Sequence, residues 1–135
     1  MTEDHLARQR QADLFLDTLN YNAHTTASDA LWAGVPVLTC LGSTFAGRVA
    51  ASQLRAVGLS ELVTESVPDY EAAGLKIATD PALCFSLKDR LARNRKTWPL
   101  FDTRRFTRNI EAAYTRMWLC DQRGEAAQSF AVDPA

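Results

Sequence analysis

The chain has 135 residues, enough for about one domain with a buried core. Its hydrophobic content of 47% and charged content of 23% are ordinary for a soluble globular protein. A net charge of -1 at pH 7 argues against nucleic-acid partners, and no apolar run approaches the ~20 residues that cross a membrane.

The N-terminal residues MTEDHLARQRQ lack the apolar core of a signal peptide. Cys40, Cys84 and Cys120 are odd in number and widely spaced, so they fit free thiols better than disulfides. His5 and His24 stand 19 positions apart without Cys or carboxylate ligands at matching intervals, which argues against a zinc site. We therefore expect a cytoplasmic protein without a bound metal.

Residues 3–11 are polar and predict a helix, with His5 and Arg8 three positions apart on one face. By themselves these residues describe a solvated helix at the flank of the fold.

Residues 12–40 predict a strand, a loop, a short helix and a second strand. Residues 12–16 are the first apolar run, and residues 35–40 are a β-branched second run. Between them, Thr25 or Thr26 is expected to cap a helix over residues 27–33, because a hydroxyl can accept from the free amides of the first turn. Gly34 and Pro36 end that helix.

A strand, a crossover helix and a parallel strand form a right-handed βαβ unit. Its loop, residues 18–24, then lies at the carboxyl edge of the sheet, where open α/β folds bind ligands. The helix start at Thr25 and Thr26 adds free amides and a positive dipole end that suit a phosphate. Asp29, one turn further on, can reach sugar hydroxyls, so the unit predicts a nucleotide site.

The rest of the chain predicts mainly helices. Ser43 or Thr44 is expected to cap a helix over residues 45–57, which Gly58 ends, and residues 59–64 form a short strand or extended link. Capping residues at Ser66, Asp80 and Asp102 precede helices over residues 69–79, from residue 81 onward, and over residues 103–123. Two sets of apolar residues at helical spacing are expected to pack in a core: Leu83, Leu87 and Leu91, and Phe106, Ile110, Ala113, Tyr114, Met117 and Trp118.

Several stretches closely resemble the SPINDLY and O-GlcNAc transferase family, whose members transfer N-acetylglucosamine from UDP-GlcNAc to Ser or Thr of proteins. The first is NAHTTASDALWAGVPV at residues 22–37, and the others keep the family's order along nearly the whole chain: TFAGRVAAS at 44–52, ELV at 61–63, PLFD at 99–102 and YTRMW at 114–118. The resemblance implies an α/β fold that is part of a Rossmann-like half, the second half of a GT-B fold. This fold has a short parallel sheet, flanking helices and a long C-terminal helix. Residues 1–123 would be the UDP-sugar-binding part, and residues 124–135 a flexible tail.

The resemblance also implies roles for six residues. His5 would stack on uracil and Arg8 would contact the base. His24, Thr25 and Thr26 would bind the diphosphate, and Asp29 would hold the ribose hydroxyls. The family's mechanism uses no metal, and its catalytic histidine matches nothing in this chain, so no catalytic residue is expected here.

The chain departs from the family pattern in three places. Leu19 and Asn20 stand where a loop proline is usual, and residues 41–43 replace a Pro-Gly pair followed by Glu or Lys. Thr2 stands where the family has a lysine on the donor diphosphate. The first two changes loosen loops, whereas the third removes a charge from the phosphate site.

We therefore expect the nucleotide-sugar-binding portion of a UDP-GlcNAc:protein O-GlcNAc transferase that lacks the upstream catalytic half and is inactive alone. Its partners would be a nucleotide sugar, a protein acceptor, and the missing N-terminal half or a TPR-containing chain. GDP-fucose, used by close relatives, stays open as the donor. The alternative is a non-catalytic remnant or UDP-binding module that needs a partner chain. An unrelated receiver or epimerase-like domain is a weaker reading, because Asp13 and Asp17 flank one strand without forming a receiver's acidic cluster.

Overall fold

The computed structural model describes residues 2–132, apart from the side chain of Thr2. By its internal contacts the chain divides into two units, Met1–Leu100 and Phe101–Ala135. The first unit contains the sheet and most of the helices, and the second contains the long C-terminal helix.

The first unit alternates helices and short strands in the order expected of a parallel α/β protein. Its elements are α1 (Thr2–Gln9), β1 (Phe15–Leu16), α2 (Thr25–Ala33), β2 (Val37–Cys40), the 3-10 turn η1 (Ala46–Arg48), α3 (Val49–Ala56), η2 (Ser60–Leu62), β3 (Val63–Thr64), α4 (Val67–Thr79) and α5 (Pro81–Asn94). A further 3-10 turn, η3 (Pro99–Phe101), precedes α6 (Thr103–Gln122).

The three strands form a parallel sheet in the order β1-β2-β3. Phe15 and Leu16 pair with Val37 and Leu38, and on the other side of β2 Thr39 and Cys40 pair with Val63 and Thr64. β2 is the central strand, and all four of its residues are buried. Because the strands are parallel, their carboxyl ends meet at one edge, where the loop after β1 and the start of α2 lie.

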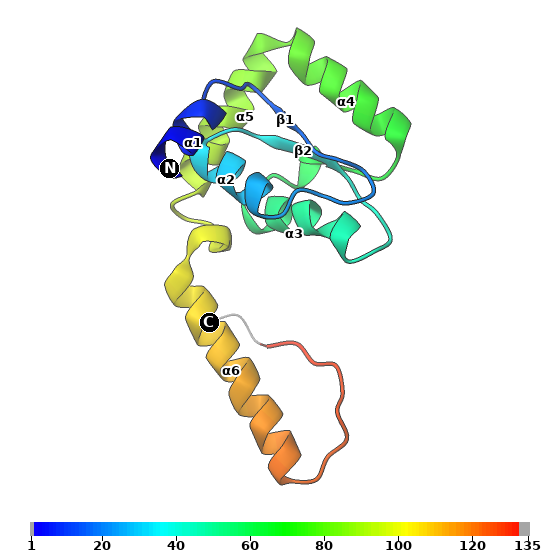
Figure 1. Ribbon diagram of the computed structural model, residues 1–135, viewed down its shortest axis with the longest axis vertical. Helices are drawn as coiled ribbons and strands as arrows, with labels where there is room; N and C mark the ends of the chain where they lie inside the picture. Colours follow the sequence, from blue (N-terminus) through cyan, green and yellow to red (C-terminus); the bar gives the residue numbers. More distant parts are fainter. Residues whose placement is uncertain (1, 133–135) are drawn as a thin grey trace. The chain divides into compact units, whose positions relative to one another are not determined.

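Helices cover both faces of this sheet (Figure 1). α4 lies over one face, with α5 packed against it, and α2 and α3 lie on the other face. Gly74 of α4 lies so close to the sheet that an added Cβ would be 3.5 Å from Leu38 Cδ2. α1 packs against α2. The expected α/β fold with a short parallel sheet, flanking helices and a long C-terminal helix is therefore confirmed.

Several helices begin or end at the capping residues and glycines that the sequence predicts. Ser66, Asp80 and Asp102 each accept a hydrogen bond from the backbone amide three residues further on, as expected of N-caps. Gly34 ends α2 with a left-handed φ of 93°.

The expected start of α2 is wrong. The helix begins at Thr25, and His24 is its N-cap residue without a side-chain hydrogen bond to the first turn. Thr25 and Thr26 therefore lie inside the first turn and cap nothing. The segment before the helix is held by Asp17: the residue before His24, Ala23, donates its amide to the Asp17 carboxylate, and Thr39 of the distant strand β2 donates to the same carboxylate.

Two other expectations need correction. The first strand is two residues long, and residues 12 and 13 lie before it, where the Ala12 carbonyl and the Asp13 carboxylate accept from Lys88 of α5. The apolar residues of α6 do not form a core in their own unit, since none of that helix's residues is buried and Phe106 and Trp118 are 64% and 61% exposed. Leu87 and Leu91 are buried as expected, while Leu83 is half-buried.

No helix among residues 2–132 is long and apolar enough to cross a membrane. Within the same part of the chain, no group of three or more His, Cys, Asp or Glu side chains is placed to hold a metal ion.

Candidate functional site

Asp17 organises the loop that follows β1. Its side chain is buried, with 4% of its surface exposed. One carboxylate oxygen, Oδ1, accepts from the amides of Thr18 at 2.9 Å and Ala23 at 2.7 Å. The other, Oδ2, accepts from Thr39 Oγ1 of β2 at 2.6 Å. The carboxylate thus closes the loop of residues 17–23 and attaches it to the central strand.

The loop also bonds to itself and to η1. Thr18 Oγ1 donates to the carbonyl of Tyr21, and Asn22 Nδ2 donates to the carbonyl of Thr18 at 2.9 Å. Asn22 is 1% exposed, and its backbone amide donates to Ala46 O at 3.0 Å. Its Oδ1 is a buried oxygen that has no hydrogen-bond partner among residues 2–132. These bonds make a closed, ordered turn at the carboxyl edge of the sheet.

His24 joins this loop to α2. Its ring stacks on Tyr21, with centroids 5.0 Å apart, and meets Phe45 edge-on at 6.3 Å. Its Nε2 lies 3.4 Å from Ala46 O, and its carbonyl accepts from Gln53 Nε2 of α3 at 3.0 Å. The imidazole is therefore held on three sides, in a fixed position beside the start of α2.

The amino end of α2 has the chemistry of an anion site. Its first intrahelical bond runs from Ser28 N to His24 O, so the amides of Thr25, Thr26 and Ala27 have no intrahelical acceptor. Both threonines are exposed, and the helix dipole adds partial positive charge at this end. An open hollow of about 360 Å³ adjoins it, lined by Phe15, Leu16, Asp17, Thr18, Tyr21, Asn22, Ala23, His24 and Thr26.

His5 of α1 and Asp29 of α2 are in contact, one turn along α2 from its amino end. His5 Nε2 lies 3.2 Å from Asp29 Oδ2, and a little over a third of each side chain is exposed. The packing of α1 on α2 brings these residues together although they are far apart in the sequence. Arg8, one turn after His5, is exposed in the last turn of α1.

Tyr70 supports the loop from the other face of the sheet. Its hydroxyl, on α4, donates to the backbone carbonyl of Asp17 at 2.9 Å. Burial raises the pKa of this phenol above its ordinary value, and the electrostatic influence of Asp17 and Cys40 adds to the rise. The sequence offered no signal for this contact, because Tyr70 stands 53 residues from Asp17.

Five of the six residues expected to bind the nucleotide sugar therefore lie in two adjoining places. His24, Thr25 and Thr26 form the start of α2, and His5 touches Asp29 one turn further along that helix. Arg8 shares α1 with His5. Sequence reasoning missed the supporting residues Asp17, Thr39 and Tyr70, although an Asp-Thr pair directly after a strand is a signal for Asp17.

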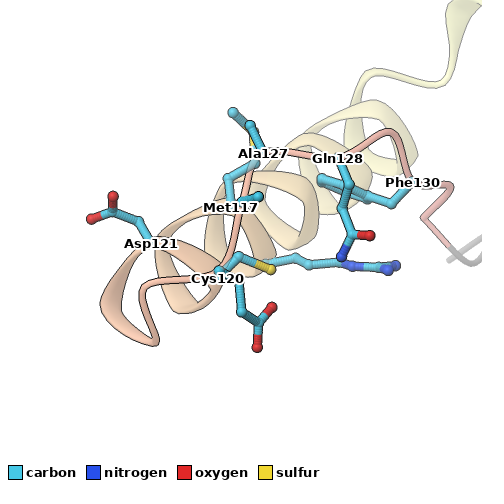
Figure 2. Close-up of a pocket in the computed structure, with 9 residues that line it drawn as sticks. Met117, Cys120, Asp121, Ala127, Gln128 and Phe130 are labelled. Atoms are coloured by element: carbon cyan, nitrogen blue, oxygen red, sulfur yellow. The ribbon is translucent and has the colours of Figure 1, made fainter.

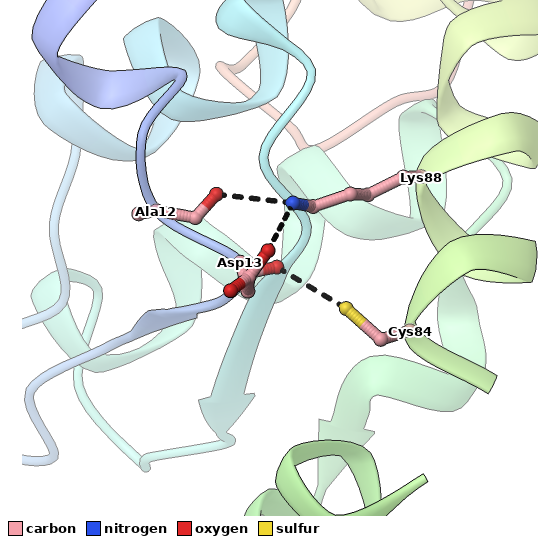
Figure 3. Close-up of polar contacts among 4 residues, drawn as sticks. All are labelled: Ala12, Asp13, Cys84 and Lys88. Atoms are coloured by element: carbon pink, nitrogen blue, oxygen red, sulfur yellow. Dashed lines mark hydrogen bonds and ion pairs between the residues drawn. The ribbon is translucent and has the colours of Figure 1, made fainter. Parts of the chain in front are cut away.

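Other hollows contain none of these six residues. In the second unit, the end of α6 and residues 125–130 line a hollow of about 290 Å³ (Figure 2). There the Arg116 guanidinium lies 4.4 Å from the centroid of the Phe130 ring. In the first unit, a hollow of about 470 Å³ is lined in part by Asp13, Cys84 and Lys88. Lys88 Nζ donates to Asp13 Oδ1 at 2.6 Å and to Ala12 O at 3.2 Å (Figure 3). These two bonds fasten α5 to the segment that leads into β1.

Comparison with known proteins assigns the chain to a family. The sequence model of glycosyl transferase family 41 matches residues 1–110. A probable UDP-N-acetylglucosamine–peptide N-acetylglucosaminyltransferase of Arabidopsis thaliana, SEC, is 38% identical over 133 residues, which are 98% of this chain and 14% of that protein. A UDP-N-acetylglucosamine–peptide N-acetylglucosaminyltransferase of Caenorhabditis elegans is 34% identical over 86% of this chain and 10% of its own length.

A solved structure is similar as well. A mutant of the Thermobaculum terrenum O-GlcNAc transferase superposes with a TM-score of 0.80 and 40% sequence identity, over 85% of this chain and 22% of that one. That transferase has a GT-B fold, so the expected relation to a GT-B fold is confirmed. The chain thus spans between a tenth and a quarter of the length of these relatives. On the sequence match, the relatives and the shared fold, the chain belongs to glycosyl transferase family 41.

Proposed function

We propose that this chain is the nucleotide-sugar-binding portion of a UDP-GlcNAc:protein O-GlcNAc transferase. Membership of glycosyl transferase family 41 and relatives named as N-acetylglucosaminyltransferases support the reaction class. The observation that carries the assignment to this part of the chain is the meeting of His5 with Asp29 beside the open end of α2. His5 for the base, Asp29 for the ribose and the start of α2 for the phosphates then lie in the same order as the base, ribose and phosphates of a nucleotide.

The proposed roles follow this order. The uracil stacks on the exposed imidazole of His5, with Arg8 at the edge of the base. Asp29 accepts hydrogen bonds from the ribose hydroxyls, which replace part of its contact with His5. The amides and hydroxyls of Thr25 and Thr26, with His24 beside them, bind the diphosphate.

The proposed chemistry uses no metal ion. As the acceptor hydroxyl attacks the anomeric carbon, the bond from that carbon to the diphosphate breaks and UDP leaves with the bonding electron pair. The positive end of α2 and the threonine hydroxyls stabilise the charge that develops on the leaving phosphate. The group that takes the acceptor's proton is expected in the remainder of a full-length transferase, so transfer requires that part in cis or as a partner chain.

Partners and location are proposed on the same basis. The partners are a nucleotide sugar, a protein acceptor, and a catalytic half or TPR-containing chain, and the location is the cytoplasm. The second candidate is a non-catalytic remnant or UDP-binding module that needs a partner chain. The need for a partner is supported by one observation: β1 pairs on one side within the described residues, and Leu16 is 59% exposed at its end. Transfer to a protein acceptor after the catalytic half is supplied separates the two candidates.

The first test is calorimetric titration of the folded chain with UDP. We expect saturable binding that His5→Ala and Asp29→Ala each weaken by about tenfold or more, because each removes a contact to the nucleoside. Glu71→Ala is the matched control, since Glu71 is exposed on α4 and has no part in the proposed site. A folded chain that fails to bind UDP, or the same affinity in all four proteins, would contradict the proposal.

A further inference from the structure

Three hydrogen-bond donors from separate parts of the chain converge on the buried carboxylate of Asp17. They are the amide of Thr18 at the start of the loop, the amide of Ala23 at its end, and the hydroxyl of Thr39 on β2. The distances, 2.9, 2.7 and 2.6 Å, are those of well-formed bonds to a charged acceptor.

An ionised carboxylate is the side chain that fits this arrangement. It accepts at both oxygens and donates nothing, so it satisfies two amides at Oδ1 and a hydroxyl at Oδ2. An asparagine has a single acceptor oxygen and would point an NH₂ group at one of the donors. Removing a donor instead leaves a buried carboxylate oxygen unsatisfied, which costs more than an exposed hydrogen bond contributes.

We infer that Asp17 is a positioning residue, which places the diphosphate-binding start of α2 relative to the sheet. Ala23, whose amide Asp17 holds, precedes the N-cap residue His24 directly. Thr39 fixes the other carboxylate oxygen to the central strand, and Tyr70 holds the Asp17 carbonyl from α4. The amides of Thr25 and Thr26 therefore have a position set by β2 and α4 rather than by a flexible loop.

This inference rests on the proposed function. It predicts that a change at Asp17 alters UDP affinity in the direction opposite to that expected from the charge of Asp17 alone. A negative carboxylate a few residues from an anion site repels the anion. If Asp17 acted through its charge, its neutralisation would strengthen UDP binding. If it acts by placing the amides, any change that loosens its bonds weakens the binding of the diphosphate and leaves the nucleoside contacts of His5 and Asp29 unchanged.

The test is an NMR titration of the chain with UDP and, separately, with uridine. Thr39→Val removes the hydroxyl that bonds Asp17 and keeps the charge and approximate volume, and Thr39→Ser restores a hydroxyl as the matched control. We expect Thr39→Val to weaken UDP binding roughly tenfold, which corresponds to about 1.4 kcal/mol, with uridine affinity within about twofold of the wild type. Thr39→Ser should recover most of the UDP affinity, and Asp17→Asn should weaken UDP binding as Thr39→Val does.

The outcomes separate this inference from the proposed function. A folded wild-type chain that binds neither UDP nor uridine overturns the proposed function. A wild-type chain that binds UDP, with Thr39→Val losing uridine and UDP affinity in parallel or losing neither, overturns the positioning role alone. Stronger UDP binding by Asp17→Asn would do the same. If Asp17→Asn does not fold, Thr39→Val and Tyr70→Phe decide, because each removes a single hydroxyl.

Discussion

Gly34 and Gly58 follow helices with φ values of 93° and 73°, in the left-handed region that favours glycine. Their surroundings differ. An added Cβ at Gly34 meets nothing within 4 Å, whereas at Gly58 it would lie 2.6 Å from Trp98 Cε2 and 2.7 Å from Asn94 Nδ2. Asn94 also donates to Val57 O at 2.8 Å, so it has little freedom to move away.

Gly58→Ala is therefore expected to lower the free energy of unfolding by about 2–4 kcal/mol, from backbone strain together with overpacking against Trp98. Gly34→Ala is the matched control and should cost about 1–2 kcal/mol, from strain alone. Urea denaturation of the two variants and the wild type measures the difference. Equal losses in both variants would show that the Trp98 contact gives way freely.

Single residues of the site differ in how far they can be predicted. Thr25, Thr26 and Asp29 can be assigned from local pattern, because their chemistry and the helix they start are neighbours in the sequence. The contact of His5 with Asp29 depends on the packing of one helix on another, and the residues alone place His5 only on a polar helix. Nothing local links Thr39 or Tyr70 to Asp17, since these contacts join three elements that are separate in the chain.

At the scale of elements, α4 contacts the sheet and the loop that follows β1 at two positions along the helix. Gly74 lets it approach Leu38 closely, and Tyr70, one turn earlier, reaches the end of β1. The helix therefore supports the site from the face opposite α2. Its local signals, the Ser66 cap and Pro68 in the first turn, predict that a helix begins here but say nothing of this support.

The raised pKa of Tyr70 gives a pH-dependent prediction. Because the folded state disfavours the phenolate, this tyrosine's contribution to stability is fully present below the unfolded pKa of 10.0 and is lost as pH rises toward the folded value. The free energy of unfolding should thus fall more steeply above about pH 10 in the wild type than in Tyr70→Phe.

Urea denaturation at about pH 9 and pH 11 measures this difference, and the phenylalanine variant accounts for the other groups that titrate in that range. If the free energy of unfolding fell equally between these two pH values in both proteins, Tyr70 would keep its ordinary pKa, and its hydroxyl would be solvated rather than held by Asp17.

At the scale of the whole molecule, the buried apolar residues all come from the first unit. Those in the described part of the chain run from Ala27 to Leu91, and α6 contributes none of them. Trp98, against Gly58, also belongs to this unit. A core complete within about 100 residues is enough for independent folding.

A chain shortened to residues 1–100 is therefore expected to unfold cooperatively, with a free energy of unfolding within about 1 kcal/mol of the full chain. Circular dichroism during urea denaturation measures both quantities. A broad, non-cooperative transition in the shortened chain would show that α6 supplies stability to the first unit. Lys88→Ala removes the bond between α5 and Asp13 within the first unit. This change should lower the free energy of unfolding of the full chain and of the shortened chain equally.

The sequence by itself determined the order and kind of the elements. Strand and helix patterns, the caps at Ser66, Asp80 and Asp102, and the terminating Gly34 are local, because each depends on residues within one or two turns. The resemblance of residues 22–37 and of the later matching segments to a transferase family implied the GT-B relation that the comparisons confirm.

Only the tertiary structure decided how these elements meet. The start of α2 is at Thr25, two residues after Ala23, whose amide the Asp17 carboxylate holds while Thr39 of β2 holds that carboxylate. The packing of α1 on α2 placed His5 against Asp29. The tertiary structure also left the apolar face of α6 exposed in its own unit, although periodicity alone had predicted a buried face. The physical reason is shared: burial and long-range hydrogen bonds depend on which surfaces pack together, and a linear pattern specifies a face without specifying its partner.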